Sequence, residues 1–363
     1  MNMNRTEALL ALNMVGDIGS VRLNKLLSIF GSPENIMRVK QDELSKIFGV
    51  GEVIAEKIVA ISRRDVEEEL SLAKKLNLKI VTIESEEYPA NLKNIPGAPI
   101  VFYVKGNLIP QDNIALAIVG SRRATLYGLT QAEEFAFGLA EQGFVIVSGL
   151  ARGIDTYSHR GALKAGKRTI AVIGSGLNCI YPPENLKLAD KIANQGAVIS
   201  EFPLNTKPLP YNFPRRNRLI SGLSLGVLVV EASRNSGALI TADFALEQGR
   251  EVFSIPGKVD SINSIGTNEL IKQGAKLVTE VSDITEEFSF LSKPQEKRAT
   301  EVIYSNNKEE DILYGFISSE ALQLDELVSI SGISIPDISN MLFKLIAKKL
   351  VKELPGKYYV RCS

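Results

Sequence analysis

The sequence predicts an α/β protein: a doubly wound, mostly parallel β-sheet, preceded by a helical module and followed by a winged helix. Apolar, β-branched runs alternate with helical patterns between residues 80 and 285, which is typical of a parallel sheet covered on both faces. Short helical patterns with glycine turns precede this region, and three helical patterns with a hairpin follow it. The expected segments are a helical module over 1–65, the sheet domain over 66–285, a linker over 286–308 and a winged helix-turn-helix over 309–363.

Composition limits the class of protein. The 363 residues contain 42 Lys and Arg and 42 Asp and Glu, so any affinity for nucleic acid must come from a local patch. The two cysteines, Cys179 and Cys362, are too few for a disulfide framework or a metal cluster. The apolar runs are shorter than the ~20 residues of a membrane helix, and the N-terminal run resembles a helix more than a signal peptide. We expect a cytoplasmic protein without a metal or cofactor.

The N-terminal module contains a candidate helix-hairpin-helix. In "LSKIFGVGEVIAEKIV", residues 44–59, Gly49 and Gly51 fit the tight turn and Ala55 lets the second helix pack closely. Main-chain N–H groups at such a turn can hold a phosphate, because the N-terminus of the next helix is electropositive. An upstream copy, "GDIGSVRLNKLL", has Asp17 in place of the first turn glycine. A small helical packing module explains these residues equally well.

Seven strands are expected in the sheet. Helical patterns such as "TQAEEFAFGLAEQG" and "GALITADFALEQG" lie between them and end in glycines suited to helix C-termini. In a doubly wound sheet, a ligand binds at the carboxyl ends of the strands. The strand runs are "IALAIVG", "FVIVSG", "TIAVIGSG", "AVISEFP", "LGVLVVEA", "EVFSIPG" and "KLVTEV".

Polar, glycine-rich segments follow three of these strands. The first, "IVGSRR", continues through two arginines toward a helix, and "SGLARGID" and "VIGSGLN" repeat the pattern. Small residues let a phosphate approach the main chain, and arginine offers paired donors to its oxygens. These segments are therefore expected to line one cleft. The candidate residues are Gly120, Ser121, Arg122, Ser148, Gly149 and Arg152, with Lys167 as a further cation on the same face.

A second candidate region is "FPLNTKPLPYNFPRRNRLISG", residues 202–222, which contains Lys207, three arginines, three aromatic residues and no acid. Cations spaced with rings suit a groove for single-stranded nucleic acid, because the cations hold phosphates and the rings stack on bases. Alternatively, the aromatic and proline residues fix a loop whose arginines are solvated. The further site residues expected here are Arg216, Asn217 and Arg218, with Tyr181 or Phe213 as a stacking ring.

No catalytic residue is expected. "GALKAGKR" has the spacing of a P-loop, but Arg168 replaces the Ser or Thr that binds magnesium, and the helix precedes the motif. Cys179 breaks the dinucleotide-binding pattern in "GSGLNC". The single histidine, His159, has no nucleophile near it in the sequence, and a structural role explains it.

Six motifs occur in the order seen in the DprA/Smf family of bacterial DNA-processing proteins. They are "GSR", "SGLARGID", "GSGLN…YPPEN", "SEFP", "FPRRNRLISGLS" and "SGALITADFALEQGREVFSIPG". The resemblance is close over residues 80–285 and extends to both flanks. It implies an extended Rossmann-like core that binds single-stranded DNA and loads the RecA recombinase onto it during natural transformation, without being an enzyme.

The resemblance also implies roles for particular residues. Gly120, Ser121, Arg122 and Lys167 would be the principal DNA contacts, with Arg216 and Arg218 supporting them. It further implies a homodimer formed through the core, whose surface we place around Ala238 to Leu246.

Two other functions stay open. The core is similar to that of phosphoribohydrolases, which would make the protein a nucleotide-binding or nucleotide-hydrolysing enzyme, but Phe244 occupies the place of that family's glutamate. The second alternative is a scaffold protein that binds no DNA. Unpaired cations at three strand ends argue against this alternative. The winged helix has Lys344, Lys348 and Lys349 late in its third helix but Asp337 at its start, so duplex DNA or a protein partner would fit it.

Overall fold

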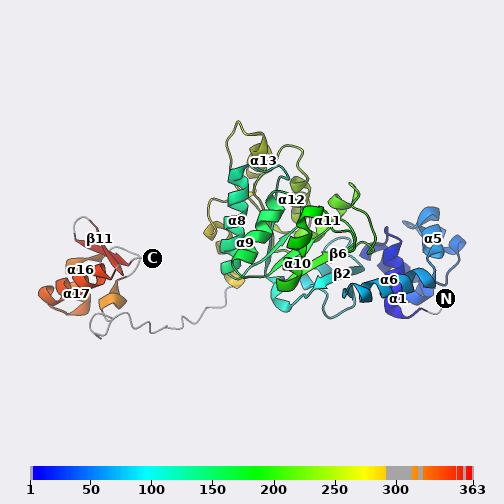
Figure 1. Ribbon diagram of the computed structural model, residues 1–363, viewed down its shortest axis with the longest axis horizontal. Coiled ribbons are helices and arrows are strands. Elements are labelled where there is room, and N and C mark those ends of the chain that lie inside the picture. Colours follow the sequence, from blue (N-terminus) through cyan, green and yellow to red (C-terminus); the bar gives the residue numbers. More distant parts are fainter. Residues whose placement is uncertain (1–2, 292–312, 318–321, 349, 355–356, 362–363) are drawn as a thin grey trace. The chain divides into compact units, whose positions relative to one another are not determined.

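The computed structural model describes residues 3–291, 313–317, 322–348, 350–354 and 357–361. Its contacts divide the chain into two units, residues 1–289 and 290–363, each with hydrophobic clusters of its own (Figure 1). None of the described helices combines the length and the apolar character that crossing a membrane requires.

The first 75 residues are largely helical, whereas the sequence predicts the helical module only over residues 1–65. The helices are α1 (Arg5–Met14), α2 (Ser20–Phe30), α3 (Pro33–Ile36), α4 (Gln41–Ser45), α5 (Gly51–Ala60) and α6 (Arg63–Lys75). The Asn4 side chain accepts the N–H of Glu7 at 2.9 Å, and the Glu7 carboxylate accepts the N–H of Asn4 at 2.8 Å, so α1 begins with a capping box. Gly49 and Gly51 have φ angles of 90° and 62°, a conformation that favours glycine. The predicted hairpin turn between α4 and α5 is therefore present.

The helical module packs directly on the sheet domain. One hydrophobic cluster contains Leu9 of α1 together with Tyr103 of the sheet. The carboxylate of Glu69, on α6, is buried and accepts the N–H of Leu204 at 2.8 Å. Residues on both sides of position 65 thus share one core, and a domain boundary there stays a prediction.

The nine-stranded sheet contains all seven predicted strands. The strands are β1 (Lys79–Thr82), β2 (Val101–Gly106), β3 (Ala115–Val119), β4 (Val145–Ser148), β5 (Thr169–Val172), β6 (Ala197–Ser200), β7 (Gly226–Val229), β8 (Glu251–Ser254) and β9 (Lys276–Leu277). Their order is β1-β2-β6-β5-β4-β3-β7-β8-β9, and β3 to β9 are all parallel. The antiparallel strands β1 and β2 were not anticipated. From β3 the chain winds first toward β6 and then toward β9, so the topological switch point lies between β3 and β7, where a ligand site is expected.

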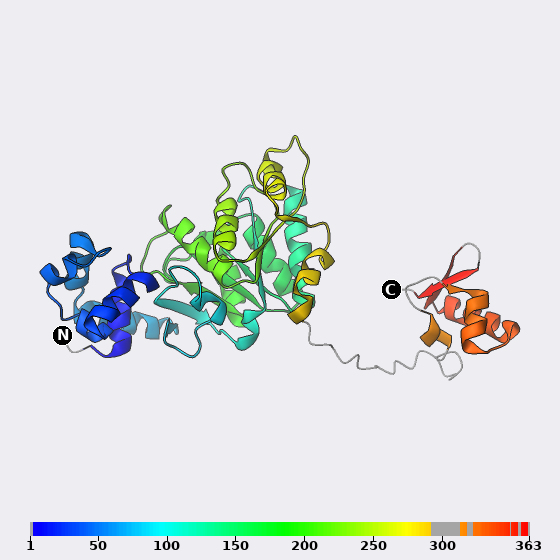
Figure 2. The same ribbon diagram turned by 180° about the vertical axis from the view of Figure 1, so that it is seen from behind.

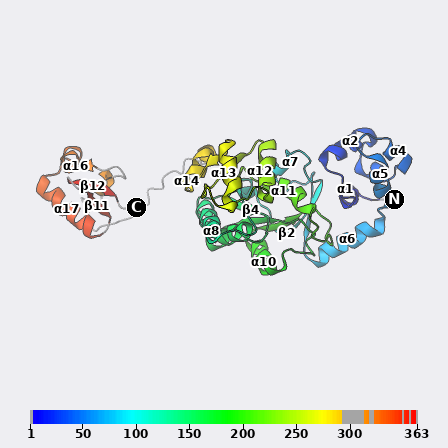
Figure 3. The ribbon, with the colours of Figure 1, turned by 90° about the horizontal axis from the view of Figure 1, so that it is seen from above.

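Helices cover both faces of this sheet. They are α7 (Ala90–Lys93), α8 (Leu126–Glu141), α9 (Ile154–Lys164), α10 (Leu186–Gln195), α11 (Asn212–Gly222), α12 (Gly237–Glu247), α13 (Ile265–Lys272) and α14 (Ser282–Thr285), with 3₁₀ turns at Pro110–Asn113, Pro183–Asn185 and Ile262–Ser264. Figure 3 shows α8 and α10 on one side and α11, α12 and α13 on the other, and Figure 2 shows the same layers from behind.

The structure differs from the sequence prediction at the start of the expected linker. Residues Glu286–Leu291 form 3₁₀ turns, labelled η4, with a kink at Phe288, which is 6% exposed. The Phe288 ring lies 5.8 Å from that of Phe144 and 6.0 Å from that of Phe253. A single buried ring inside a polar segment produces no periodicity, which is why the sequence did not reveal this contact. The rest of the expected linker, residues 292–308, lies outside the described residues.

The second unit contains the helices and strands expected near the C-terminus. Residues 313–316 are helical and are followed by β10 (Leu322–Gln323), α16 (Leu324–Ser331), α17 (Ile335–Ala347), β11 (Val351–Leu354) and β12 (Tyr358–Arg361). The strands form a sheet in the order β10-β12-β11, and Leu327 and Leu342 lie in its core. The assignment of this unit as a winged helix stays a prediction, and the expected turn at Pro355 and Gly356 lies outside the described residues.

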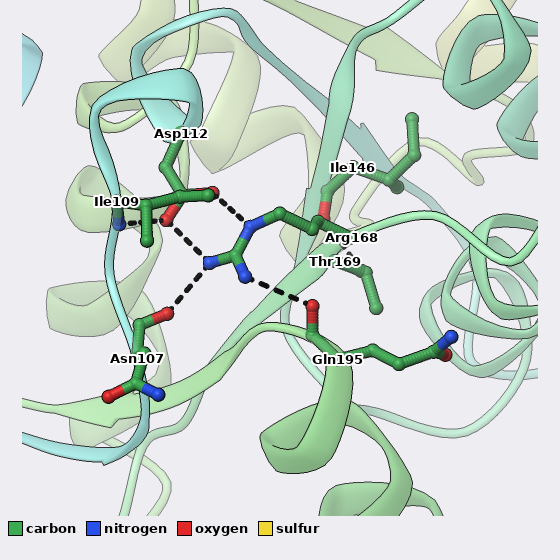
Figure 4. A network of polar contacts seen from close by, with 7 residues as sticks. All are labelled: Asn107, Ile109, Asp112, Ile146, Arg168, Thr169 and Gln195. Atoms are coloured by element: carbon green, nitrogen blue, oxygen red, sulfur yellow. Dashed lines mark hydrogen bonds and ion pairs between the residues drawn. The ribbon is translucent and has the colours of Figure 1, made fainter.

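A polar network fixes the amino edge of the main sheet (Figure 4). Arg168 precedes β5 and donates to both carboxylate oxygens of Asp112, at 2.8 and 2.9 Å. It also donates to the carbonyl oxygens of Asn107 at 2.7 Å and Gln195 at 3.1 Å. Asp112 is 6% exposed, so this is a largely buried, bidentate ion pair. The residue that disqualifies the P-loop motif therefore has a structural role.

We expect Asp112→Ala to lower the free energy of unfolding by about 2–3 kcal/mol, because it leaves the Arg168 guanidinium partly buried and without its carboxylate. The control is Asp190→Ala, which removes the exposed pair that Asp190 forms with Lys105 at 2.6 Å. That change should lower the free energy of unfolding by about 1 kcal/mol or less. Urea unfolding measures both, and equal losses would contradict the structural role of the network.

Candidate functional site

A cleft of about 770 Å³ opens at the carboxyl ends of β3 and β7, at the topological switch point. Its walls come from the β3–α8 loop, the N-terminal half of α11 and the start of α12. The sequence-predicted residues in its lining are Gly120, Ser121, Arg122, Arg216 and Asn217, and both expected stacking rings, Tyr181 and Phe213, are there too.

Hydrogen bonds connect the β3–α8 loop to the segment that follows β7. The N–H of Ser121 donates to the carbonyl oxygen of Glu231 at 2.8 Å. The Glu231 carboxylate, on a residue 4% exposed, accepts the N–H of Thr125 at 2.9 Å and the Thr125 hydroxyl at 2.5 Å. Thr125 caps α8, so one acid fixes both ends of the loop. The side chains of Arg122 and Arg123, between these ends, are exposed.

Two aromatic rings of the cleft, Phe213 and Tyr181, lie between two cations, Arg122 and Arg152. The guanidinium carbon of Arg122 lies 5.0 Å from the centroid of the Phe213 ring, close enough for a cation–π contact. The Phe213 and Tyr181 rings lie 6.0 Å apart, and Arg152 lies 5.9 Å from the Tyr181 ring. The order is therefore Arg122, Phe213, Tyr181, Arg152, and each neighbour comes from a different segment of the chain.

Arg216 lies at the bottom of the cleft and is 3% exposed. Its Nη1 donates to the carbonyl oxygen of Gly149 at 2.6 Å and to that of Val172, which joins the ends of β4 and β5. Burial lowers the pKa of the Arg216 guanidinium to about 10, and the nearby Asp155 carboxylate opposes this shift. Asp155 accepts the N–H groups of Gly149 at 3.1 Å and Ala151 at 3.3 Å, while burial raises its pKa.

Three other predicted residues are held inside the protein. The Ser148 hydroxyl is fully buried and donates to the carbonyl oxygen of Ile118 at 2.6 Å. Gly149 packs against Arg216, and a side chain at this position would collide with it. Asn217 donates to the carbonyl oxygen of Gly237 at 3.1 Å, which ties α11 to the start of α12. These residues shape the cleft more than they present free groups to a ligand.

The structure places Arg218 away from the cleft. Its guanidinium pairs with the carboxylate of Glu201, which is 8% exposed, and both residues line a separate cavity of about 310 Å³ beside Gly16 and Arg22 of the helical module. Successive residues of a helix point in different directions, so Arg216 and Arg218 cannot both face the cleft. The expectation that Arg218 lies at the strand-end site is therefore wrong.

Lys167 also lies elsewhere. It follows α9 and precedes β5, and its N–H donates to the carbonyl oxygen of Ala162 at 3.0 Å. It is thus at the amino edge of the parallel sheet, opposite Gly120, and its Nζ lies 3.9 Å from a carboxylate oxygen of Glu141. The prediction that Lys167 shares a face with Arg122 is wrong. A contact between Lys167 and DNA stays a prediction, separate from the cleft.

Most of the expected cations are paired with acids. Arg152 pairs with Glu184, and Arg218 with Glu201, so the expectation of unpaired cations at three strand ends is wrong. Within the described part of the chain, Arg122 and Arg123 form no ion pair. Sequence reasoning missed Glu231, although one acid at the end of the apolar run "LGVLVVEA" was a visible signal.

His159 is fully buried, and its Nδ1 lies 2.7 Å from the Thr169 hydroxyl. Burial lowers its pKa to about 3, and nearby Arg216 contributes to the same shift. The ring is therefore neutral near pH 7, in keeping with a structural residue. Among the described residues, no group of three His, Cys, Asp or Glu side chains is arranged to hold a metal ion.

The chain matches known families over most of its described length. The sequence profile of the DNA recombination-mediator protein A family matches residues 79–289. The chain belongs to this family. A second profile, that of SAM-like helix-hairpin-helix tandems, matches residues 9–64, which confirms the nature of the N-terminal module. The predicted resemblance to the DprA/Smf family is likewise confirmed.

Individual relatives agree with this assignment. Protein Smf of Escherichia coli K12 is 40% identical over 311 residues, covering 84% of this chain and 83% of that protein. The X-ray structure of DNA processing protein A from Streptococcus pneumoniae matches with a TM-score of 0.69 and 36% identity, covering 79% of this chain and 99% of that one. DNA processing protein A from Helicobacter pylori, whose structure addresses its single-stranded DNA binding mode, matches with a TM-score of 0.53 and 30% identity over 59% of this chain and 98% of that one.

We expect Glu231→Gln to lower the free energy of unfolding by about 1–2 kcal/mol, because a neutral amide accepts hydrogen bonds from Thr125 more weakly than a carboxylate does. Main-chain hydrogen exchange should also become faster over residues 121–125. Glu184→Gln, at an exposed ion pair, is the control and should change the stability by about 0.5 kcal/mol or less. Unchanged exchange over the loop would show that Glu231 does not hold it.

Proposed function

We propose that this protein binds single-stranded DNA in the cleft at the carboxyl ends of β3 and β7. The observation that carries the proposal is the position of Arg122. Its guanidinium is exposed, forms no ion pair within the described residues and lies over the Phe213 ring at the border of the cleft. A cation and a ring in contact can hold a phosphate and stack on the adjacent base, the combination that single-stranded nucleic acid requires.

Main-chain donors lie beside this pair. The N–H groups of Arg122 and Gly153 make no hydrogen bond with any described residue. Gly153 immediately precedes α9, and its main chain packs so closely on Ser121 and Arg122 that a side chain would collide there. The main chain at Gly153 and Arg122 therefore lies at the start of the 11-residue helix α9, and the N-terminus of a helix favours an anion.

The bound strand would be recognised through its phosphates and not through its sequence. The groups at the cleft are cations, amides and rings, and rings stack on every base. Binding should therefore weaken as salt is added, with a log–log slope of about −0.7 for each phosphate neutralised.

We further propose that the protein loads RecA onto the bound strand and acts as a homodimer. The recombination-mediator family to which the chain belongs supports the first proposal. An exposed apolar side chain on α12 supports the second: Leu246 is 61% exposed, within the surface placed at Ala238 to Leu246. A monomeric mass in sedimentation equilibrium, at concentrations that support binding to DNA, would contradict the dimer.

We expect Arg122→Glu to raise the Kd for an oligo-dT of about 20 nucleotides by about tenfold or more. The log–log salt slope should become shallower by about 0.7 for each phosphate that the variant no longer neutralises. Fluorescence anisotropy over a salt series measures both, with a duplex of equal length as comparison. Arg122 is exposed, so the variant should unfold like the wild type.

Two further variants complete the series. Arg64→Glu changes the charge equally on α6, where the side chain is 86% exposed, and should leave the Kd near that of the wild type. Lys167→Glu asks whether the amino edge of the sheet also contacts DNA. If Arg122→Glu binds like the wild type at matched salt, the cleft is not the DNA site.

A further inference from the structure

A second, basic groove lies between α9 and α10. Its volume is about 710 Å³, and four cations line it, two from each helix. Arg160 and Lys164 are four residues apart on α9, and Lys187 and Lys191 are four apart on α10, so each pair lies on one face of its helix at a spacing of about 6 Å. All four side chains are exposed, and the partly buried Leu163 and Leu188 also line the groove.

Three of these cations form no ion pair among the described residues: Arg160, Lys187 and Lys191. Arg160 contacts a ring, that of Tyr157, at 4.9 Å. Lys164 is the exception, because it pairs with Glu133 at 2.9 Å.

The acids nearby are already neutralised. Glu184, the one acid in the lining, pairs with Arg152. Asp190, on α10, pairs with Lys105 at 2.6 Å. A solvated helix face usually carries positive and negative side chains interspersed. This groove instead has an excess of positive charge, which attracts a polyanion.

A series of side-chain contacts connects this groove to the strand-end cleft. Arg122 lies over Phe213, Phe213 adjoins Tyr181, and Arg152 lies over Tyr181 and pairs with Glu184. Tyr181 lines the cleft, and Glu184, three residues later, lines the groove. The two sites therefore border the same short segment of chain.

We propose that the groove between α9 and α10 is a second binding segment for the same single strand, which leaves the cleft past Tyr181 and Arg152 and continues along Arg160, Lys187 and Lys191. This proposal rests on single-strand binding in the cleft. The groove would add affinity only to strands long enough to span both sites, because it contributes phosphate contacts beyond those of the cleft.

The test compares the binding of two single-stranded oligonucleotides, and of a duplex as long as the longer one, to three proteins by fluorescence anisotropy. A short oligo-dT of about 6 nucleotides occupies the cleft alone, and one of about 30 nucleotides reaches both sites. The groove variant is Arg160→Gln, Lys187→Gln and Lys191→Gln together. The matched control removes the same charge from exposed positions in the helical module and β1, with Lys74→Gln, Lys75→Gln and Lys79→Gln.

We expect the groove variant to bind the long strand about tenfold more weakly than the wild type, with its salt slope reduced by up to about 2, and to bind the short strand unchanged. The control should match the wild type on both strands. The proposal is overturned if the groove variant binds the long strand like the wild type, or if it loses affinity for both strands equally.

Two other outcomes also count against it. An equal loss in the control would mean that net charge is responsible, and a loss confined to a duplex of equal length would assign the groove to duplex DNA. If the wild type binds neither single strand, the proposed function itself fails. That result is distinguishable, because it appears before any variant is compared.

Discussion

The buried guanidinium of Arg216 holds together the carboxyl ends of the central strands, and the shape of the cleft depends on it. Through one nitrogen it binds the carbonyl oxygens of Gly149 and Val172, at the ends of β4 and β5. Asp155, close by, binds the N–H groups of Gly149 and Ala151. A charged group this deeply buried is costly unless hydrogen bonds surround it, so the loops around it have little freedom to move.

The three arginines of α11 each bind a different partner near the carboxyl ends of the strands. Arg215 donates to the carbonyl oxygen of Gly16 in the helical module and lies 5.6 Å from the Phe202 ring. Arg216 fixes the strand ends, and Arg218 pairs with Glu201. The arginine-rich segment is therefore mainly structural, and its Arg216 and Asn217 line the cleft together with Phe213. The exposed cations of the site come from the β3–α8 loop.

Much of this could be predicted from sequence. Buried parallel strands appear in the sequence as runs of β-branched residues, so all seven parallel strands were predicted. The glycine-rich end of β3 indicated the loop that borders the cleft. The directions of Arg216 and Arg218 could not be predicted, because they depend on where α11 begins and how it rotates against the sheet. The position of Lys167 could have been predicted, because a residue between a helix and the following strand lies at the amino edge of a parallel sheet.

The central claim is that single-stranded DNA occupies the cleft beside Arg122. Hydrogen–deuterium exchange of the full chain, with and without saturating oligo-dT, tests it most directly, because it locates the bound strand without any substitution. We expect slower exchange over residues 120–125 and 151–154, with residues 107–113 at the opposite edge of the sheet unchanged. Binding that leaves residues 120–125 unprotected would contradict the claim.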